Sequence, residues 1–210
     1  MRIFVNQKEF KIGGTNLLRD SALTAAYHSA WSTKAVDKAK SSSVDWLDDQ
    51  VAITNGDIIQ SLTNVKPNTT YTFSFSLEFQ DISYPGGNQF FFVEYADQTF
   101  SKTTNIYEDH RYSGETFNNT GGRMDKSWTF TTQPDCHALQ VYVRQEKNGG
   151  AFRVKNLKLE MGDVATDWSP APEDIFARID ELSSKIGGVA RYLYACLVNT
   201  LATSTEMEVA

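Results

Sequence analysis

A strict alternation of apolar and polar side chains runs through Tyr71-Thr72-Phe73-Ser74-Phe75-Ser76-Leu77-Glu78-Phe79. Successive side chains of a β-strand point to opposite faces, so this pattern predicts a strand with one buried face and one face in water. Leu139 to Arg144 alternates in the same way. Phe152 to Leu159 does so with a change of phase near Lys155-Asn156, which indicates a β-bulge. Gln89 to Gln98 is more continuously apolar, as in a strand that is covered on both sides.

Further short strands flank these. Ser127 to Thr132 places Trp128 and Phe130 on one face, whereas Val51 to Thr54 and Ile58 to Leu62 enclose Asn55-Gly56, a pair typical of a hairpin turn. Breaks rich in Gly and Asn separate the strands, at residues 85–88, 118–122 and 148–150. Short strands with no helical period between them predict a mainly β fold, an antiparallel β-sandwich.

The first 43 residues carry weaker signals. Arg2 to Val5 is apolar enough for a short strand. Ser21 to Ser43 is rich in Ala, Ser and Lys, and this composition predicts a loop or a weak helix around Trp31.

The pattern changes after Gly162. Asp167-Trp168-Ser169-Pro170-Ala171-Pro172 cannot continue a central strand, because proline lacks the backbone donor. From Glu173 onward, apolar residues recur at spacings of 4, 3, 4, 3 and 4, as in a coiled-coil seam: Ile175, Ile179, Leu182, Ile186, Val189 and Leu193. Gly187-Gly188 is expected to interrupt this helix. The helix either docks on its own sandwich or joins copies of the chain. We therefore expect an N-terminal arm (1–13), a β-sandwich (14–168) and a proline linker with a C-terminal helix (169–210).

Composition excludes several classes of function. The 210 residues carry a formal net charge of −6, which gives no general attraction for nucleic acid or anionic lipid. No stretch approaches the roughly 20 apolar residues of a membrane-spanning helix, and the start MRIFVNQKEF does not resemble a signal peptide. Cys136 and Cys196 are expected to be unpaired, and the three histidines lack metal-ligand spacing.

Catalytic motifs are not evident in the sequence. Asp48-Asp49 does not suit a glycosidase pair, because neighbouring strand residues point to opposite faces, and we expect a solvated turn there. Asp109-His110 has no nucleophile placed beside it and is expected to be an exposed loop pair. The sequence therefore does not predict an enzyme.

Three passages resemble a known class of domain: Gly14-Thr15-Asn16-Leu17-Leu18, Val65 to Phe75 and Asn156 to Asp174. They are similar to the opening, a middle strand and the closing phrase of carbohydrate-binding-module-like jelly-roll domains in bacteriophage tail and baseplate proteins. The resemblance spans about residues 14 to 174 and implies a virion tail component, made in the host cytoplasm. Its expected partners are other tail or baseplate proteins, host cell-wall saccharide and copies of itself, with a trimer favoured by the habits of that class.

The resemblance also leaves alternatives open. One is a cellular or prophage-encoded carbohydrate-binding adhesin, and a saccharide-degrading tail enzyme ranks behind both. The chain would be either a small stand-alone protein or a fragment. No cofactor is expected, although such domains often carry a structural calcium ion, to which Asp163 and Asp167 could contribute.

Candidate saccharide contacts follow from strand parity. Saccharide sites combine an aromatic ring with polar side chains that bind hydroxyls. Tyr142 and Arg144 project together from the face of their strand opposite to Leu139, Val141 and Val143. Phe92 and Glu94 likewise share one face of the predicted strand from Gln89 to Gln98, although the sequence leaves open which face of that strand is buried.

Overall fold

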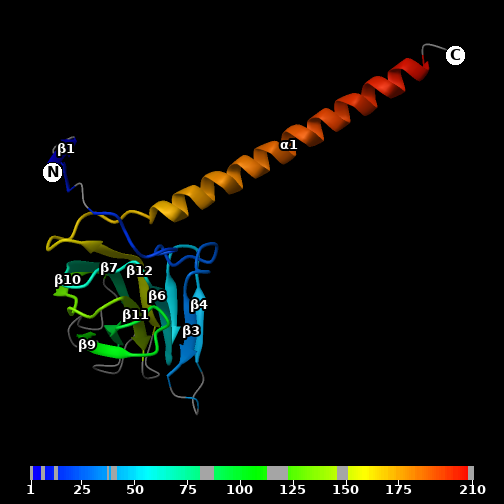
Figure 1. Ribbon diagram of the computed structural model, residues 1–210. Helices are drawn as coiled ribbons and strands as arrows, with labels where there is room; N and C mark the ends of the chain where they lie inside the picture. Colours follow the sequence, from blue (N-terminus) through cyan, green and yellow to red (C-terminus); the bar gives the residue numbers. More distant parts are fainter. Residues whose placement is uncertain are drawn as a thin grey trace. The chain divides into compact units, whose positions relative to one another are not determined.

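The computed structural model describes residues 2–5, 8–11, 14–36, 38, 42–80, 88–112, 123–145 and 151–207. Its elements are β1 (Arg2–Val5), β2 (Lys8–Lys11), β3 (Ser32–Ala35), β4 (Ser43–Trp46), β5 (Val51–Thr54), β6 (Gly56–Leu62), β7 (Thr70–Gln80), β8 (Asn88–Tyr95), β9 (Thr103–Tyr112), β10 (Arg123–Thr131), β11 (Ala138–Gln145), β12 (Ala151–Met161) and α1 (Pro172–Met207) (Figure 1). The chain forms two compact units, Met1–Ala171 and Pro172–Ala210.

Two five-stranded antiparallel sheets form most of the first unit. The first sheet has the order β10-β7-β12-β5-β4, and the second has the order β3-β6-β11-β8-β9. Strands β1 and β2 pair with each other. The predicted mainly β, antiparallel sandwich followed by a C-terminal helix is confirmed.

The hydrophobic core lies between the two sheets, where aromatic rings of β7 and β8 meet. Phe75 of the first sheet stacks on Phe90 of the second with ring centroids 4.0 Å apart. Phe73 meets the edge of Phe92 at 5.2 Å. The apolar positions of β7 from Tyr71 to Leu77 are all buried, so the alternation in the sequence marks the core face correctly.

The predicted bulge is present in β12. The register against β7 shifts between Lys155 and Lys158, and Asn156 adopts a left-handed backbone conformation with φ of 55°. Leu157 and Leu159 therefore point into the core, while Lys158 and Glu160 lie on the other face of the sheet.

A single side chain, Asn16, joins the beginning of the sandwich to its end. The two N–H bonds of its amide are shared among three acceptors, Ser21 Oγ, Leu157 O and Ser169 O, at 2.9, 3.1 and 2.9 Å. Its carbonyl oxygen accepts from the backbone N–H groups of Leu18 and Leu159, at 3.0 and 3.2 Å. The asparagine of the Gly14–Leu18 passage therefore has a structural role.

Two local predictions are wrong. Asn55-Gly56 is not a hairpin turn, because β5 belongs to the first sheet and β6 to the second. With φ of 46°, Asn55 instead bends the chain from one sheet to the other, and its N–H donates to Gln145 Oε1. Residues 21–43 contain β3, a strand that pairs with β6, where a loop or weak helix was expected.

The strand β9 also differs from expectation. Asp109-His110 was predicted to be an exposed loop pair, but both residues lie in β9, which pairs with β8. Their side chains are outside the described residues, as are the Gly/Asn-rich breaks at 118–122 and 148–150.

Helix α1 runs without a break through Gly187-Gly188, so the expected interruption is wrong (Figure 1). The seam side chains are 44 to 69% exposed: Ile175, Ile179, Leu182, Ile186 and Val189. The side chain of Leu193 lies outside the described residues. Within the described residues, no helix is both long and apolar enough to cross a membrane.

Candidate functional site

Tyr142 and Arg144 lie together on the outer face of the second sheet. The neighbouring Leu139, Val141 and Val143 are fully buried on the core face. Because β11 pairs with β8 in a register that sets Tyr142 opposite Phe91, these two rings stack at 4.4 Å with planes 12° apart. The Arg144 guanidinium lies 4.8 Å from the centre of the Phe91 ring. We call this group, with Gln140 and Tyr95, the Tyr142 platform.

Hydrogen bonds hold the platform in one arrangement. The hydroxyls of Tyr95 and Tyr142 both donate to Gln140 Oε1, at 2.7 and 2.8 Å. The amide of Gln140 donates to Ser61 Oγ at 3.0 Å. Arg144 forms a two-pronged ion pair with Asp57, at 2.7 and 2.9 Å. Phe91 and Tyr95 are only 9% exposed, so the platform presents mainly the half-buried side chains of Gln140, Tyr142 and Arg144, which these bonds hold with little rotational freedom.

The charge state of the platform is also set by its surroundings. Burial raises the pKa of the Tyr142 phenol to about 12, and the neighbouring Tyr95 adds to this effect. The phenol therefore remains a neutral hydrogen-bond donor over the whole physiological range of pH.

Phe92 and Glu94 are not available to a ligand, which corrects the second pair of candidates. Both side chains are 0% exposed. Phe92 faces the core, where it packs against Phe73 and Phe130, and the Glu94 carboxylate accepts from the backbone N–H of Gln133. The residue on the outer face is Phe91, which the sequence did not single out because Phe90-Phe91-Phe92-Val93 is apolar on both faces.

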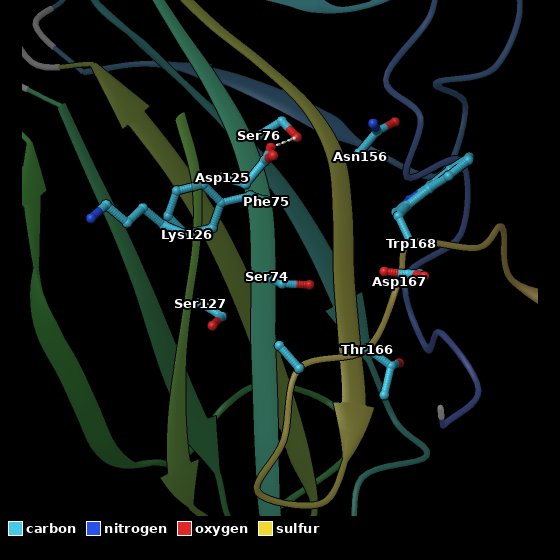
Figure 2. A pocket seen from close by; sticks show the side chains of 11 residues that line it. Ser74, Phe75, Ser76, Asp125, Lys126, Ser127, Asn156, Thr166, Asp167 and Trp168 are labelled. Carbon is cyan, nitrogen blue, oxygen red and sulfur yellow. Dashed lines mark hydrogen bonds between the residues drawn. The ribbon is translucent and has the colours of Figure 1, made fainter. Parts of the chain in front are cut away.

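A hollow of about 420 Å³ opens on the outer face of the first sheet (Figure 2). Its lining combines hydroxyl, carboxylate, amide and aromatic groups from β7, β10, β12 and the segment 165–168: Ser74, Phe75, Ser76, Asp125, Lys126, Ser127, Asn156, Ala165, Thr166, Asp167 and Trp168. Nothing in the sequence indicated this hollow, because its lining residues are up to 94 positions apart, from Ser74 to Trp168.

A buried ammonium group lies beneath this segment. Lys158 Nζ donates to Thr166 Oγ1 at 2.6 Å and to Asp167 O at 2.9 Å, and it lies 3.3 Å from a carboxylate oxygen of Glu160. Both ionic side chains are almost completely buried. Among the described residues, which include Asp163 and Asp167, no group of three or more His, Cys, Asp or Glu suited to a metal occurs.

Cys136 is a free thiol inside the core, in agreement with the expectation that it is unpaired. Its pKa is raised to about 12, first by burial and then by the charge of Glu94. The side chain of Cys196 lies outside the described residues.

The comparisons with known proteins concern the fold. The enzymatically active domain of tailspike protein 4 of bacteriophage CBA120 superposes on 70% of this chain with a TM-score of 0.51 at 9% identity. The CBM22-1 and GH10 modules of a Clostridium thermocellum endo-1,4-beta-D-xylanase, complexed with xylohexaose, superpose on 74% of it with a TM-score of 0.51 at 6% identity. The fold is that of a carbohydrate-binding-module-like sandwich.

This chain spans only 22% and 30% of the lengths of those two proteins. A xylan-binding CBM22-1 domain from Paenibacillus barcinonensis is matched over 98% of its length, with 73% of this chain, a TM-score of 0.48 and 14% identity. No protein-family model matches the sequence, and no curated protein matches it.

Proposed function

We propose that the sandwich binds a saccharide through the Tyr142 platform. The observation that carries this proposal is the packing of Phe91 and Tyr142 beside Arg144 on the outer face of a sheet. Aromatic groups contact the C–H surfaces of sugars, while the amide of Gln140 and the guanidinium of Arg144 supply donors for hydroxyl groups. The carbohydrate-binding-module-like fold supports the same role.

The experiment compares Tyr142→Leu with Tyr27→Leu, which removes another half-buried ring from a loop of the same unit. Binding is measured by isothermal titration against host cell-wall polysaccharide and xylohexaose, with the melting temperature of each variant recorded. We expect Tyr142→Leu to weaken binding at least about tenfold and Tyr27→Leu to leave it unchanged. Equal affinity of both variants would refute the platform as the site.

We also propose that the role is binding rather than catalysis. The assay is incubation with host cell-wall polysaccharide followed by measurement of released reducing ends. The expected result is no release above a heat-treated control. Steady release would favour the saccharide-degrading tail enzyme instead.

We further propose that the protein is a structural component of a phage tail or baseplate and contacts the host cell surface. Support comes from the resemblance of Asn156 to Asp174 to the closing phrase of such domains and from the order of sandwich and helix. A density map of the intact virion tests this by showing whether the sandwich is present in the tail, and in how many copies. A cellular or prophage-encoded adhesin would instead be found on the bacterial surface.

Self-association through α1 is the fourth part of the proposal. In the heptad, Ile179 and Ile186 take the a positions and Ile175, Leu182 and Val189 take the d positions. The seam side chains are exposed, and burying them against copies of the same helix would remove them from water. The mix of Ile, Leu and Val along the seam does not decide the number of strands, so we propose a trimer on the habits of the class of domain that the sequence resembles.

Sedimentation of Leu182→Glu tests the trimer. A charge in the seam should reduce the mass to that of one chain. Ser184→Glu is the matched control, because Ser184 lies at the f position opposite the seam. An unchanged mass for Leu182→Glu would overturn the proposal.

A further inference from the structure

We infer that the hollow on the first sheet is a second saccharide site, separate from the Tyr142 platform. It lies on the other sheet of the sandwich, and no residue of the platform lines it. Its volume of about 420 Å³ is within the range of pockets that hold small ligands.

The floor of the hollow is a polar surface built by strand register. Ser76 pairs with Asp125 and Ser74 pairs with Ser127 across β7 and β10, so these four side chains share the outer face. The hydroxyl of Ser76 donates to the Asp125 carboxylate (Figure 2). Closely spaced hydroxyl and carboxylate oxygens match the vicinal hydroxyl groups of a sugar ring.

The wall of the hollow is held in place before any ligand arrives. Thr166 donates from its backbone N–H and from its hydroxyl to the Glu160 carboxylate, at 2.8 and 2.5 Å. Lys158 binds the Asp167 carbonyl oxygen, and the Trp168 indole N–H donates to Leu157 O at 3.2 Å. The indole is therefore fixed by its own hydrogen bond, and the rigid wall lowers the entropic cost of binding.

The charges favour a particular class of sugar. Asp125 and Asp167 bring two carboxylates to the hollow, whereas the Lys126 side chain extends away from Ser74 and Ser76 (Figure 2). Carboxylates repel an acidic ligand and accept hydrogen bonds from hydroxyl or amino groups. The ligand class is therefore a neutral or amino sugar, and uronic acids are disfavoured.

The test is a heteronuclear NMR titration of the full chain with glucose, glucosamine, N-acetylglucosamine and glucuronate. We expect amide shifts at residues 165–168 and at Ser74 with the neutral and amino sugars, and at least about tenfold weaker binding of glucuronate. Ser127→Tyr should fill the hollow and remove these shifts. Thr129→Tyr is the matched control, because Thr129 is the next outward position on β10 and does not line the hollow.

A second pair of variants keeps the size of the side chain unchanged. Asp167→Asn should weaken glucosamine binding by at least about threefold. Asp163 is exposed and lies outside the hollow on the same segment, so Asp163→Asn should leave glucosamine binding unchanged. Absence of shifts at 165–168 with every sugar, or their persistence in Ser127→Tyr, would overturn the inference. Shifts confined to Phe91 and Tyr142 would overturn it while leaving the proposed function intact.

Discussion

Replacing Asn16 should destabilise the sandwich far more than the loss of one polar side chain suggests. The side chain is 1% exposed and takes part in five hydrogen bonds with segments 16–21, 157–159 and 169. Asn16→Leu preserves approximate volume but leaves the N–H groups of Leu18 and Leu159 and the carbonyl of Ser169 without this partner. Each buried group left unsatisfied costs roughly 1–3 kcal/mol, so we expect a loss of about 4 kcal/mol.

Asn16→Asp also tests the direction in which stability changes with pH, because aspartate keeps the two acceptor contacts of Asn16 and loses its N–H donors. Its carboxylate would face the carbonyl oxygens of Leu157 and Ser169, so its pKa in the folded state should rise above about 3.9, the unfolded value. A group with a raised folded pKa destabilises the fold as the pH rises through that value. Asn16→Asp should therefore be closer to wild type at pH 4 than at pH 7.

The assay is urea unfolding followed by tryptophan fluorescence at both pH values. Asn64→Asp, at an exposed position, is the control and should change the free energy of unfolding by less than about 0.5 kcal/mol. The reasoning is refuted by a loss below about 1 kcal/mol in both Asn16 variants, or by a larger defect at pH 4 than at pH 7 in Asn16→Asp.

Three further predictions concern buried or helical groups. Lys158→Met should lower the free energy of unfolding in urea by about 3 kcal/mol, because it leaves the buried Glu160 carboxylate without its ion-pair partner. A loss below about 1 kcal/mol would contradict this role of Lys158. A chelator should leave the melting temperature of the wild-type protein unchanged. Gly187→Ala and Gly188→Ala should each stabilise α1 by up to about 1 kcal/mol, since a Cβ meets no atom within 4 Å at either position. Circular dichroism during heating measures the loss of helix, and melting of the helix at a lower temperature in either variant would contradict this. Cys136, with a pKa raised to about 12, should alkylate at pH 8 only as fast as the protein unfolds, and peptide mapping that shows rapid alkylation in the native state would disprove its burial.

Strand periodicity predicted the parts of the fold that depend on local sequence. Phe73 and Phe75 point to the core, Val141 and Val143 turn Tyr142 outward, and the phase change at Asn156 is a bulge. These predictions succeed because each residue's face depends only on its position within its own strand. The spacing of apolar residues likewise predicted a helix at the C-terminal end of the chain, but it did not decide whether the seam docks on the sandwich or joins copies of the chain.

Strand periodicity does not predict which distant segments of the chain pair with each other. Asn55-Gly56 has the composition of a hairpin, yet β6 pairs with β3 and β11 and not with β5. The run Phe90 to Val93 is apolar on both faces, so only its register with β11 shows that Phe91, and not Phe92, lies beside Tyr142.

The two proposed binding surfaces differ in whether the sequence could predict them. Parity along one strand was enough to place Tyr142 and Arg144 on a common outer face. The hollow, by contrast, exists because β7, β10 and the bulge of β12 come together and because a buried ion pair holds segment 165–168 beside them. Its residues have no common period in the sequence, since free energy gained by packing and hydrogen bonding in three dimensions, and not local propensity, brings them to one place.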